Sequence, residues 1–313
     1  MATATDLSPT QHGLTTGCGL GFLGVLVLLL GACAQHQNRP SDSAAVTPPA
    51  NGQHQLEQDL RFSPDTWPQT LHADLYTPAI ESPDGGFPAM IMVHGGGWEG
   101  RSRQDMNRAA RRFANAGYLV LNIDYRFAPE YPYPEAVHDV QQALRWLHEQ
   151  AGALSVDTGR IGLLGFSSGA HLASLAALTA GTDHELDQPW SGAAYRPAAV
   201  VVGGTPTDLR KFGSGRLVEQ FLGGTMEAVP ARYEAASPVT QVHADSPPFF
   251  HFHGTWDRLV PPDHSSDFHA ELLAAGVHSE LYRMRLRGHA TSLVFSGDAL
   301  SAAVDFMNHQ LYP

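Results

Sequence analysis

Cysteine is nearly absent from this chain: its 313 residues include two, Cys18 and Cys33, and both lie close to the N-terminus. The body that follows therefore has no thiol and no disulfide. Basic residues are also few, with a single lysine at Lys211 and no basic run in a chain of formal net charge −12. Nucleic-acid binding needs lysine and arginine clustered opposite the phosphates, so the sequence argues against a nucleic-acid partner.

Apolar residues are plentiful by contrast, at 43% of the chain against 16% charged residues, together with 31 glycines and 22 prolines. This mixture is typical of a well-buried core with many shaped turns, and it excludes disorder across the whole chain. The length allows one or two domains, and no internal repeat is visible.

The N-terminal region has the features of a targeting segment. Residues 13–34 carry no charge, and residues 20–30 form an apolar core of signal-peptide length. The tetrad Leu30-Gly31-Ala32-Cys33 that follows resembles a bacterial lipobox, in which the cysteine becomes the lipidated first residue of the mature protein. Residues 1–12 lack the lysine or arginine that usually precedes such a stretch, so an ordinary signal peptide or an uncleaved anchor stays open. Each of these predicts a protein outside the cytoplasm, secreted, periplasmic or tethered to a membrane.

A polar segment separates this region from the body of the chain. Residues 34–55 contain the pair Pro48-Pro49 and show no apolar periodicity, so we expect a flexible linker after a signal region over residues 1–33. The folded domain is then expected over residues 56–313.

Short apolar runs in the body predict buried strands. Alternating stretches near Leu60 and at residues 71–76 open the series, and nearly continuous runs follow at residues 89–93, 119–123, 161–164, 199–202 and 249–252. Between the runs lie helical patterns, at residues 134–147 with one apolar stripe and at residues 170–178 with apolar residues nearly all round. The alternation predicts an α/β domain with a doubly wound, mostly parallel sheet and with its chemistry at the carboxyl ends of the strands.

One of these strands is followed by a serine in a glycine-rich turn. The run Gly165-Phe166-Ser167-Ser168-Gly169 comes after the strand at residues 161–164 and before the buried helix. A G-x-S-x-G match alone is a weak signal, but this strand–turn–helix context is the one that a nucleophile elbow requires. We therefore take Ser167 as the candidate nucleophile and the N–H of Ser168 as a candidate oxyanion donor.

A second glycine-rich run follows the strand at residues 89–93. In His94-Gly95-Gly96-Gly97-Trp98 the bare backbone N–H groups can approach a substrate oxygen closely. Gly95 and Gly96 are the expected donors to the oxyanion, with one residue of freedom in that choice. His94 precedes both the donors and the nucleophile, so we expect it to fix the loop.

Four motifs in this order resemble the HGGG-type esterases, meaning the hormone-sensitive-lipase-like and related BD-FAE-type carboxylesterases. They are His94 to Trp98, the segment 124–130 (Asp-Tyr-Arg-Phe-Ala-Pro-Glu), Gly165 to Gly169 and the segment 253–257 (His-Gly-Thr-Trp-Asp). The resemblance covers about residues 57–313 and implies an α/β-hydrolase fold with a small lid insertion. It also implies hydrolysis of carboxylic esters without metal or organic cofactor, and a structural role for Asp124 and Glu130.

The resemblance implies a chain order of serine, acid and histidine for the catalytic residues. Asp257 follows the strand at residues 249–252 and matches the acid loop of the family, while Asp263 and Asp267 fall where the next helix should begin. His289 follows the strand at residues 280–286 in a Gly-His pair and is the expected base. His171, four residues after Ser167, is expected to pack inside its helix.

The pair His251 and His253 lies on one face of a strand and could suggest zinc. No third ligand motif accompanies the pair, so we expect a structural role and no metal.

These residues predict a serine carboxylesterase that works through an acyl-enzyme on a small-molecule ester. Short-chain acyl esters and acetylated carbohydrates are the candidate substrates, and residues 205–246 lie where the fold inserts its lid. A serine peptidase of the prolyl-oligopeptidase type is an alternative, although Ala170 stands where those enzymes usually have a second glycine. A lipid-anchored binding protein that kept the fold without activity is another. The oligomeric state stays open.

Overall fold

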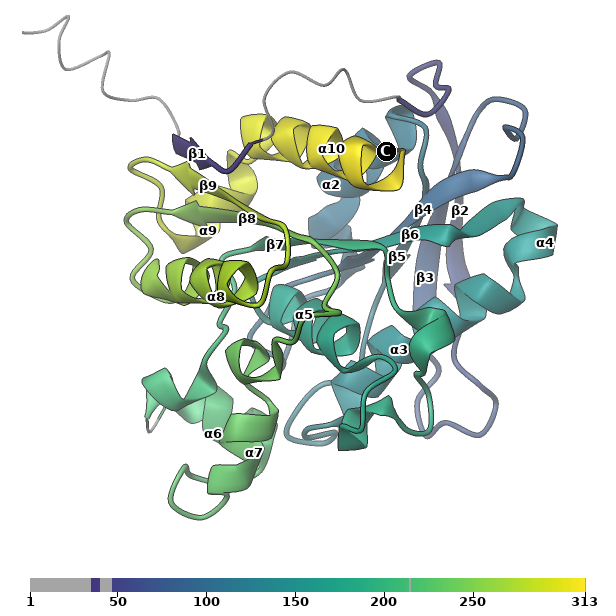
Figure 1. Cartoon of the computed structure of the whole chain (residues 1–313). Helices are drawn as coiled ribbons and strands as arrows, with labels where there is room; N and C mark the ends of the chain where they lie inside the picture. The colour runs from purple at the N-terminus through teal and green to yellow at the C-terminus, as the bar shows by residue number, and fades with distance from the viewer. Residues whose placement is uncertain (1–34, 40–46, 214, 313) are drawn as a thin grey trace, which may run out of the picture. The chain divides into compact units, whose positions relative to one another are not determined.

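The structure of the chain is a computed structural model, which describes residues 35–39, 47–213 and 215–312 (Figure 1). Cys18, Cys33 and the apolar segment over residues 13–34 lie outside the described residues. Within the described part, no helix has both the length and the apolar character needed to cross a membrane.

A sheet of nine strands runs through the described part in the order β1-β9-β8-β7-β6-β4-β5-β3-β2. The strands are β1 (Gln35–Gln37), β2 (His54–Arg61), β3 (His72–Pro78), β4 (Phe87–Val93), β5 (Leu119–Ile123), β6 (Val156–Phe166), β7 (Ala199–Gly203), β8 (Phe249–Gly254) and β9 (Ser279–Met284). From β5 across β4, β6, β7 and β8 to β9 the pairings are parallel, and the strands at both margins are antiparallel. The predicted doubly wound, mostly parallel sheet is confirmed.

Helices cover both faces of this sheet (Figure 1). One face carries α2 (Asn107–Asn115) and α10 (Gly297–Leu311), and the other carries α3 (Glu135–Glu149), α5 (Ser168–Thr179) and α8 (Asp263–Ala274). The shorter helices are α4 (Ala151–Leu154), α6 (Arg216–Leu222), α7 (Pro230–Ala235) and α9 (His289–Val294). Both α6 and α7 belong to the predicted lid insertion, which lies between β7 and β8.

The central strand β4 explains why the sheet needs cover on both sides. All of its residues are buried, with Ile91 and Val93 in the core beneath α3 and α5 and with Met90 and Met92 in the core beneath α2 and α10. Because successive side chains of a strand point to opposite faces, an unbroken apolar run can be buried only between two layers of helices. This packing fixes the carboxyl ends of the strands along one edge.

The predicted linker over residues 34–55 differs from what the structure shows. Gln35–Gln37 form β1, which pairs with β9, and His54 already begins β2. The ring nitrogen Nε2 of His36 lies 2.7 Å from Glu280 Oε2 on β9. Without β1 the outer edge of β9 would leave backbone N–H and C=O groups unpaired, and a strand of polar residues satisfies them as well as an apolar one.

Candidate active site

Ser167 occupies a sharp turn between β6 and α5. Its backbone has φ 54° and ψ −123°, a conformation that residues other than glycine rarely adopt, and its N–H donates to Gly203 O at 2.8 Å. The flanking glycines permit this turn, since a Cβ on Gly165 would lie 2.4 Å from Gly169 O and a Cβ on Gly169 would lie 2.2 Å from Val93 O. The spacing of the glycines in this motif therefore reflects close backbone packing, which places Ser167 at the edge of the sheet.

His289 is the first residue of α9, just after the chain leaves β9. Its Nε2 lies 2.8 Å from Ser167 Oγ, and its Nδ1 lies 2.7 Å from Asp257 Oδ2. If Nδ1 carries the proton and donates to the carboxylate, Nε2 is the acceptor for the serine hydroxyl. Residues 122 positions apart in the chain are thus joined directly.

Asp257 is a buried carboxylate in the loop after β8. Its Oδ1 accepts from the backbone N–H groups of Leu259 at 3.0 Å and Val260 at 2.9 Å, and His253 Nε2 lies 3.3 Å from Oδ2. Burial alone raises the pKa of a carboxyl, but hydrogen bonds from His253 and His289 outweigh it and hold the pKa of Asp257 well below its usual range. The carboxylate is therefore ionised beside the imidazole.

The other acidic residues weighed in the sequence lie elsewhere. Asp263 and Asp267, at the start of α8, both pair with Lys211 Nζ, at 2.9 Å and 2.6 Å. Asp124 accepts from the backbone N–H of Arg103 at 2.8 Å, and Glu130 is exposed. The structure brings none of these four carboxylates to Ser167.

The loop after β4 runs alongside Ser167. A Cβ on Gly95 would lie 3.2 Å from Ser167 Cβ, and Gly96 has a φ of +133° at which a Cβ would meet Gly100 O at 2.0 Å. Gly95, Gly96 and Ser168 border the same cavity as Ser167. As the first residue of α5, Ser168 also has a backbone N–H without an acceptor inside the helix.

Two histidines near the motifs have packing contacts. His94 is fully buried, donates from Nδ1 to Gly95 O at 2.6 Å and stacks on Tyr125 with ring centroids 4.4 Å apart. His171 is also fully buried, with Trp98 Nε1 at 3.3 Å from its Nδ1 and Ala236 O at 2.7 Å from its Nε2. Burial lowers the pKa of both rings, so both are neutral.

The pair on β8 is likewise engaged with protein groups. His251 Nε2 lies 3.1 Å from Ser279 Oγ, and His253 contacts Ser265 Oγ through Nδ1 and Val260 O through Nε2. Across the described residues no cluster of three or more histidine, cysteine, aspartate or glutamate side chains could hold a metal ion.

A cavity of about 720 Å³ opens beside Ser167 and His289. Its walls are mainly apolar, with Phe212, Leu217 and Val218 from the lid insertion on one side and Leu293 of α9 on the other. A pocket of this size accommodates a drug-sized ligand or smaller. An ester could therefore reach the serine hydroxyl with its acyl group against aliphatic side chains.

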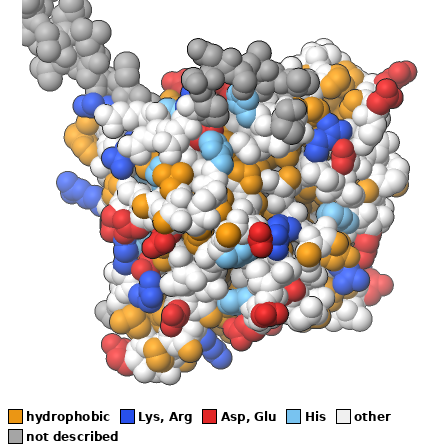
Figure 2. Space-filling model, viewed as in Figure 1, with side chains coloured by type: hydrophobic (Ala, Val, Ile, Leu, Met, Phe, Trp, Pro, Cys, Tyr) orange, Lys and Arg blue, Asp and Glu red, His pale blue; other side chains and the backbone are white. Residues whose placement is uncertain are grey.

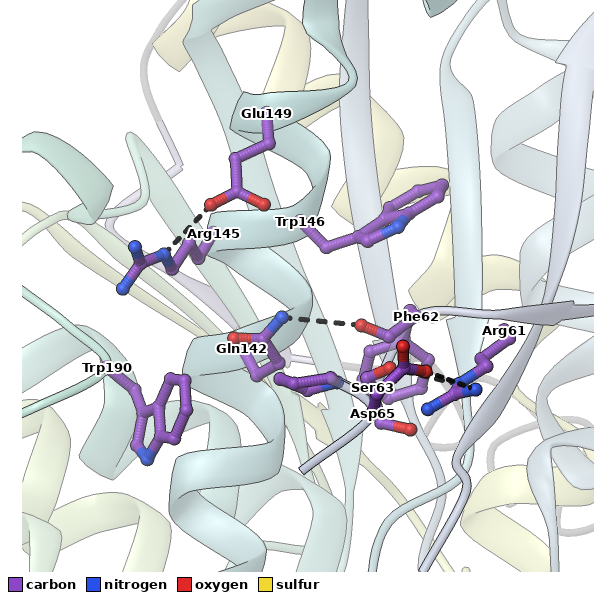
Figure 3. A pocket seen from close by; sticks show the side chains of 10 residues that line it. Arg61, Phe62, Ser63, Asp65, Gln142, Arg145, Trp146, Glu149 and Trp190 are labelled. Atoms are coloured by element: carbon purple, nitrogen blue, oxygen red, sulfur yellow. Dashed lines mark hydrogen bonds and ion pairs between the residues drawn. The ribbon is translucent and has the colours of Figure 1, made fainter. Parts of the chain in front are cut away.

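A second hollow, of about 460 Å³, is lined by the loop after β2 and by α3 (Figure 3). Trp146 and Trp190 border it, and the charged side chains on its rim are paired, Arg145 with Glu149 and Arg61 with Asp65. None of the residues that line it is a histidine, and no serine there is hydrogen-bonded to one. This hollow therefore lacks the pair of nucleophile and histidine base that acyl transfer at Ser167 would use.

Two residues that support the site lie in the sequence motifs, but the sequence assigns them no contact with the catalytic residues. His253 approaches Asp257 from β8, and the hydroxyl of Tyr125 donates to His94 O at 3.1 Å and lies 3.3 Å from Ser168 Oγ. Tyr125 lies two residues after β5 at the active edge of the sheet and within the motif at residues 124–130, and these are the local signals that indicate it. His253 belongs to the histidine pair for which the sequence predicts a structural role, and its contact with Asp257 depends on the loop geometry.

Comparison with known proteins places the chain among esterase relatives. It is 31% identical over 202 residues to Esterase LipQ of Mycobacterium tuberculosis, covering 62% of this chain and 48% of the relative. It is 28% identical over 246 residues to the probable carboxylic ester hydrolase LipM of the same organism, covering 74% of this chain and 56% of the relative. The chain thus spans about half the length of the curated relatives it matches.

Solved structures share the fold at lower sequence identity. A truncated carbohydrate esterase from gut microbiota matches with a TM-score of 0.72 and 21% identity, over 86% of this chain and 100% of the other. EstE1, a thermophilic carboxylesterase cloned from a metagenomic library, matches with a TM-score of 0.68 and 24% identity, over 86% and 92%. These likenesses show an α/β-hydrolase fold. The family model for BD-FAE matches residues 73–272, which is more than half of the sequence, and the chain therefore belongs to the BD-FAE family.

Proposed function

We propose that this protein is a serine carboxylic ester hydrolase in which Ser167 is the nucleophile, His289 the general base and Asp257 the residue that orients the base. The observation that carries the proposal is the hydrogen-bonded chain from Ser167 Oγ through His289 to Asp257, which opens onto a mainly apolar cavity. The names of the relatives, an esterase and a probable carboxylic ester hydrolase, support the same class of reaction.

In the proposed reaction, Ser167 Oγ attacks the ester carbonyl carbon while its proton passes to His289 Nε2. The ionised Asp257 stabilises the imidazolium, and the backbone N–H groups of Gly95, Gly96 and Ser168 stabilise the oxyanion. Collapse of the tetrahedral intermediate breaks the ester C–O bond, and the alcohol leaves with the proton from His289. Water then attacks the acyl-enzyme by the same route and releases the carboxylic acid.

For the substrate we propose short-chain acyl esters, including acetyl groups on carbohydrates. The apolar side chains of the lid suit a small acyl group, and the cavity leaves room for an alcohol portion larger than ethanol. A series of p-nitrophenyl esters of increasing chain length, measured beside acetylated xylan, tests this. Highest kcat/KM on long-chain esters with none on acetylated xylan would reject both substrate classes.

Labelling by a fluorophosphonate probe tests the nucleophile. We expect mass spectrometry to find the probe on Ser167, because its hydroxyl contacts His289 at the cavity, whereas Ser265 and Ser279, which also contact histidines, are buried away from it. A protein that had kept the fold as a binding scaffold would not react, and labelling at a different serine would refute the assignment.

We further propose that the domain works outside the cytoplasm, tethered through lipidated Cys33. The support is the uncharged apolar segment ending in a lipobox-like tetrad. Replacement of Cys33 by serine should abolish incorporation of radiolabelled fatty acid in a bacterial host. Unchanged incorporation would contradict the tether.

A further inference from the structure

Five large apolar side chains stand exposed beside the mouth of the cavity. They form what we call the apolar collar, Trp256, Leu259, Leu286, Val294 and Phe295, with exposed fractions from 54% for Phe295 to 65% for Trp256. The other large apolar side chains with high exposure in the described residues, Leu56 and Leu273, reach 45% and 42%. Single exposed apolar residues are ordinary on protein surfaces, whereas a contiguous group indicates an interaction surface.

The collar is contiguous because two loops are hydrogen-bonded to each other. The N–H of Trp256 donates to Arg287 O at 2.9 Å, and the N–H of Leu286 donates to Thr255 Oγ1 at 3.0 Å. The guanidinium of Arg287 lies 4.6 Å from the ring centroid of Phe295, which connects the end of α9 to the same group. Leu259 and Val294 also line the cavity, so the collar continues its rim outward.

Two features of Leu286 are unfavourable for the stability of the folded chain. Its backbone has a φ of 59°, a left-handed conformation that a leucine adopts only under constraint, and that conformation presents an exposed apolar side chain. Neither feature stabilises the fold. Such a residue indicates a contact made with something outside the chain.

Three arginines lie within the collar. Arg258, Arg285 and Arg287 alternate with Leu259 and Leu286 in sequence, and none of the three forms an ion pair with any residue that the structure describes. They stand out in a chain of net charge −12. Figure 2 shows basic, hydrophobic and acidic side chains together at the left, the side on which Figure 1 shows β8 and β9. Exposed apolar and aromatic groups with unpaired cations among them suit the interface of an anionic bilayer.

The described domain also begins at this edge. In the pairing of β1 with β9, Gln35 lies opposite Arg283, at the carboxyl end of β9, and Gln37 lies opposite Leu281, further inside the strand (Figure 1). Gln35, the first described residue, therefore lies at the edge that carries the collar and the cavity.

We propose that the apolar collar is a docking surface for an anionic phospholipid bilayer. Docking would bring the bilayer against the edge of the domain that contains Ser167. A second copy of the chain fits less well, because a two-fold contact would bring the same unpaired arginines face to face. A polysaccharide also fits less well, because aliphatic Leu259, Leu286 and Val294 offer sugar hydroxyls no hydrogen-bond partner. The docking is independent of catalysis, and so it can fail or hold whether or not the protein hydrolyses esters.

Tryptophan quenching in the full-length chain tests the docking. The protein is bound to vesicles of phosphatidylcholine and phosphatidylglycerol, with and without brominated acyl chains, which quench only nearby indoles. We expect brominated lipid to remove most of the emission contributed by Trp256, measured as the difference between the wild type and Trp256→Phe. Trp146→Phe is the control, since its indole borders the hollow on α3, and we expect that variant to retain the full quenching of the wild type.

A double variant, Leu286→Ser with Phe295→Ser, should lose the quenching of Trp256 while its turnover of soluble p-nitrophenyl acetate stays at the wild-type level, which shows that it folds. The matched control, Leu56→Ser with Leu273→Ser, removes two exposed leucines away from the collar and should keep the quenching.

Three results would overturn the proposal. One is Trp256 emission that is equally bright on brominated and unbrominated lipid, or that is quenched as much in the double variant of Leu286 and Phe295 as in the wild type. Another is quenching that does not depend on phosphatidylglycerol. The third is a change in Trp256 emission caused by soluble xylan or by self-association in the absence of vesicles, which would assign the collar to a polysaccharide or to a second copy.

Discussion

Asp257 shows how single contacts set both the position and the charge of a catalytic residue. One of its oxygens accepts two backbone N–H groups from its own loop, which leaves the other oxygen aimed at His289. Because these donors favour the ionised form, the low pKa of this carboxyl keeps its negative charge available across the range in which a histidine titrates. The residue therefore fixes the orientation of the imidazole and stabilises its protonated form.

Replacing Asp257 by asparagine should lower kcat by about 10⁴-fold, because the amide has one acceptor atom and no charge with which to hold the imidazolium. Steady-state kinetics with p-nitrophenyl acetate measures the effect. The control is Asp263→Asn, which changes a carboxylate paired with Lys211 at the surface and should leave kcat near the wild-type value. Equal activity of the two variants would remove Asp257 from the mechanism.

The sequence predicts a functional residue where a strong local pattern surrounds it. Ser167 and Gly95 lie in such patterns, because close backbone contacts require glycine at fixed positions around them. The contact of Tyr125 with Ser168 depends on how separate strands are aligned, and that of His253 with Asp257 depends on how the loop after β8 folds back, and no local pattern records either.

At the scale of an element, the loop from His94 to Gly100 is shaped by a backbone that tolerates little change. Gly96 has a positive φ and no room for a Cβ, whereas Gly95 has an ordinary backbone and a Cβ would press on Phe166 O at 3.1 Å. At Gly100 no atom lies within 4 Å of the position that a Cβ would take. The three glycines thus differ in what a methyl group would disturb.

Substitution of Gly95 by alanine should lower kcat by about 10²-fold through displacement of an oxyanion donor, with little change in the midpoint of urea unfolding. Gly100→Ala belongs to the same loop and should retain the wild-type kcat. Kinetics and unfolding of both variants provide the measurement. If Gly95→Ala were as active as Gly100→Ala, Gly95 would not be a donor.

The same contrast between local and distant causes applies to whole elements. The strand over residues 119–123 was predicted with the bounds of β5, because an apolar run between polar turns is sufficient to define a buried strand. The strand predicted at residues 161–164 is longer in the structure, since β6 begins at Val156 with polar residues that show no apolar pattern. For the same reason the sequence predicts a linker where the structure has β1: backbone pairing with β9 forms this strand, and its side chains show no pattern that indicates the pairing.

Across the whole molecule, buried histidines make the free energy of unfolding depend on pH. Burial lowers the pKa of His171 and of His264 to about 4, below the value of about 6.5 for an exposed histidine. Between these values the unfolded chain binds protons that the folded chain does not. The contribution of each neutral ring is therefore fully present above pH 6.5 and is lost as the pH falls toward 4.

The free energy of unfolding should accordingly be lower at pH 5.0 than at pH 7.5, by about 2 kcal/mol for His171 alone. The variant His171→Gln cannot titrate, so urea unfolding at the two pH values should show a correspondingly smaller difference than in the wild type. His54→Gln, at the surface against Asn115, is the comparison and should behave as the wild type does. An unchanged pH difference in His171→Gln would contradict this cause.

The central claim is that Ser167 performs nucleophilic catalysis, and the most direct measurement is kcat for p-nitrophenyl acetate in Ser167→Ala. We expect a fall of about 10⁴-fold or more, leaving the residual rate due to binding and the oxyanion donors. Ser174→Ala removes a buried hydroxyl from the same helix, where it bonds to Ala170 O at 2.8 Å, and should keep nearly all activity. A Ser167→Ala protein that turns over the ester as fast as Ser174→Ala would show that Ser167 is not the nucleophile.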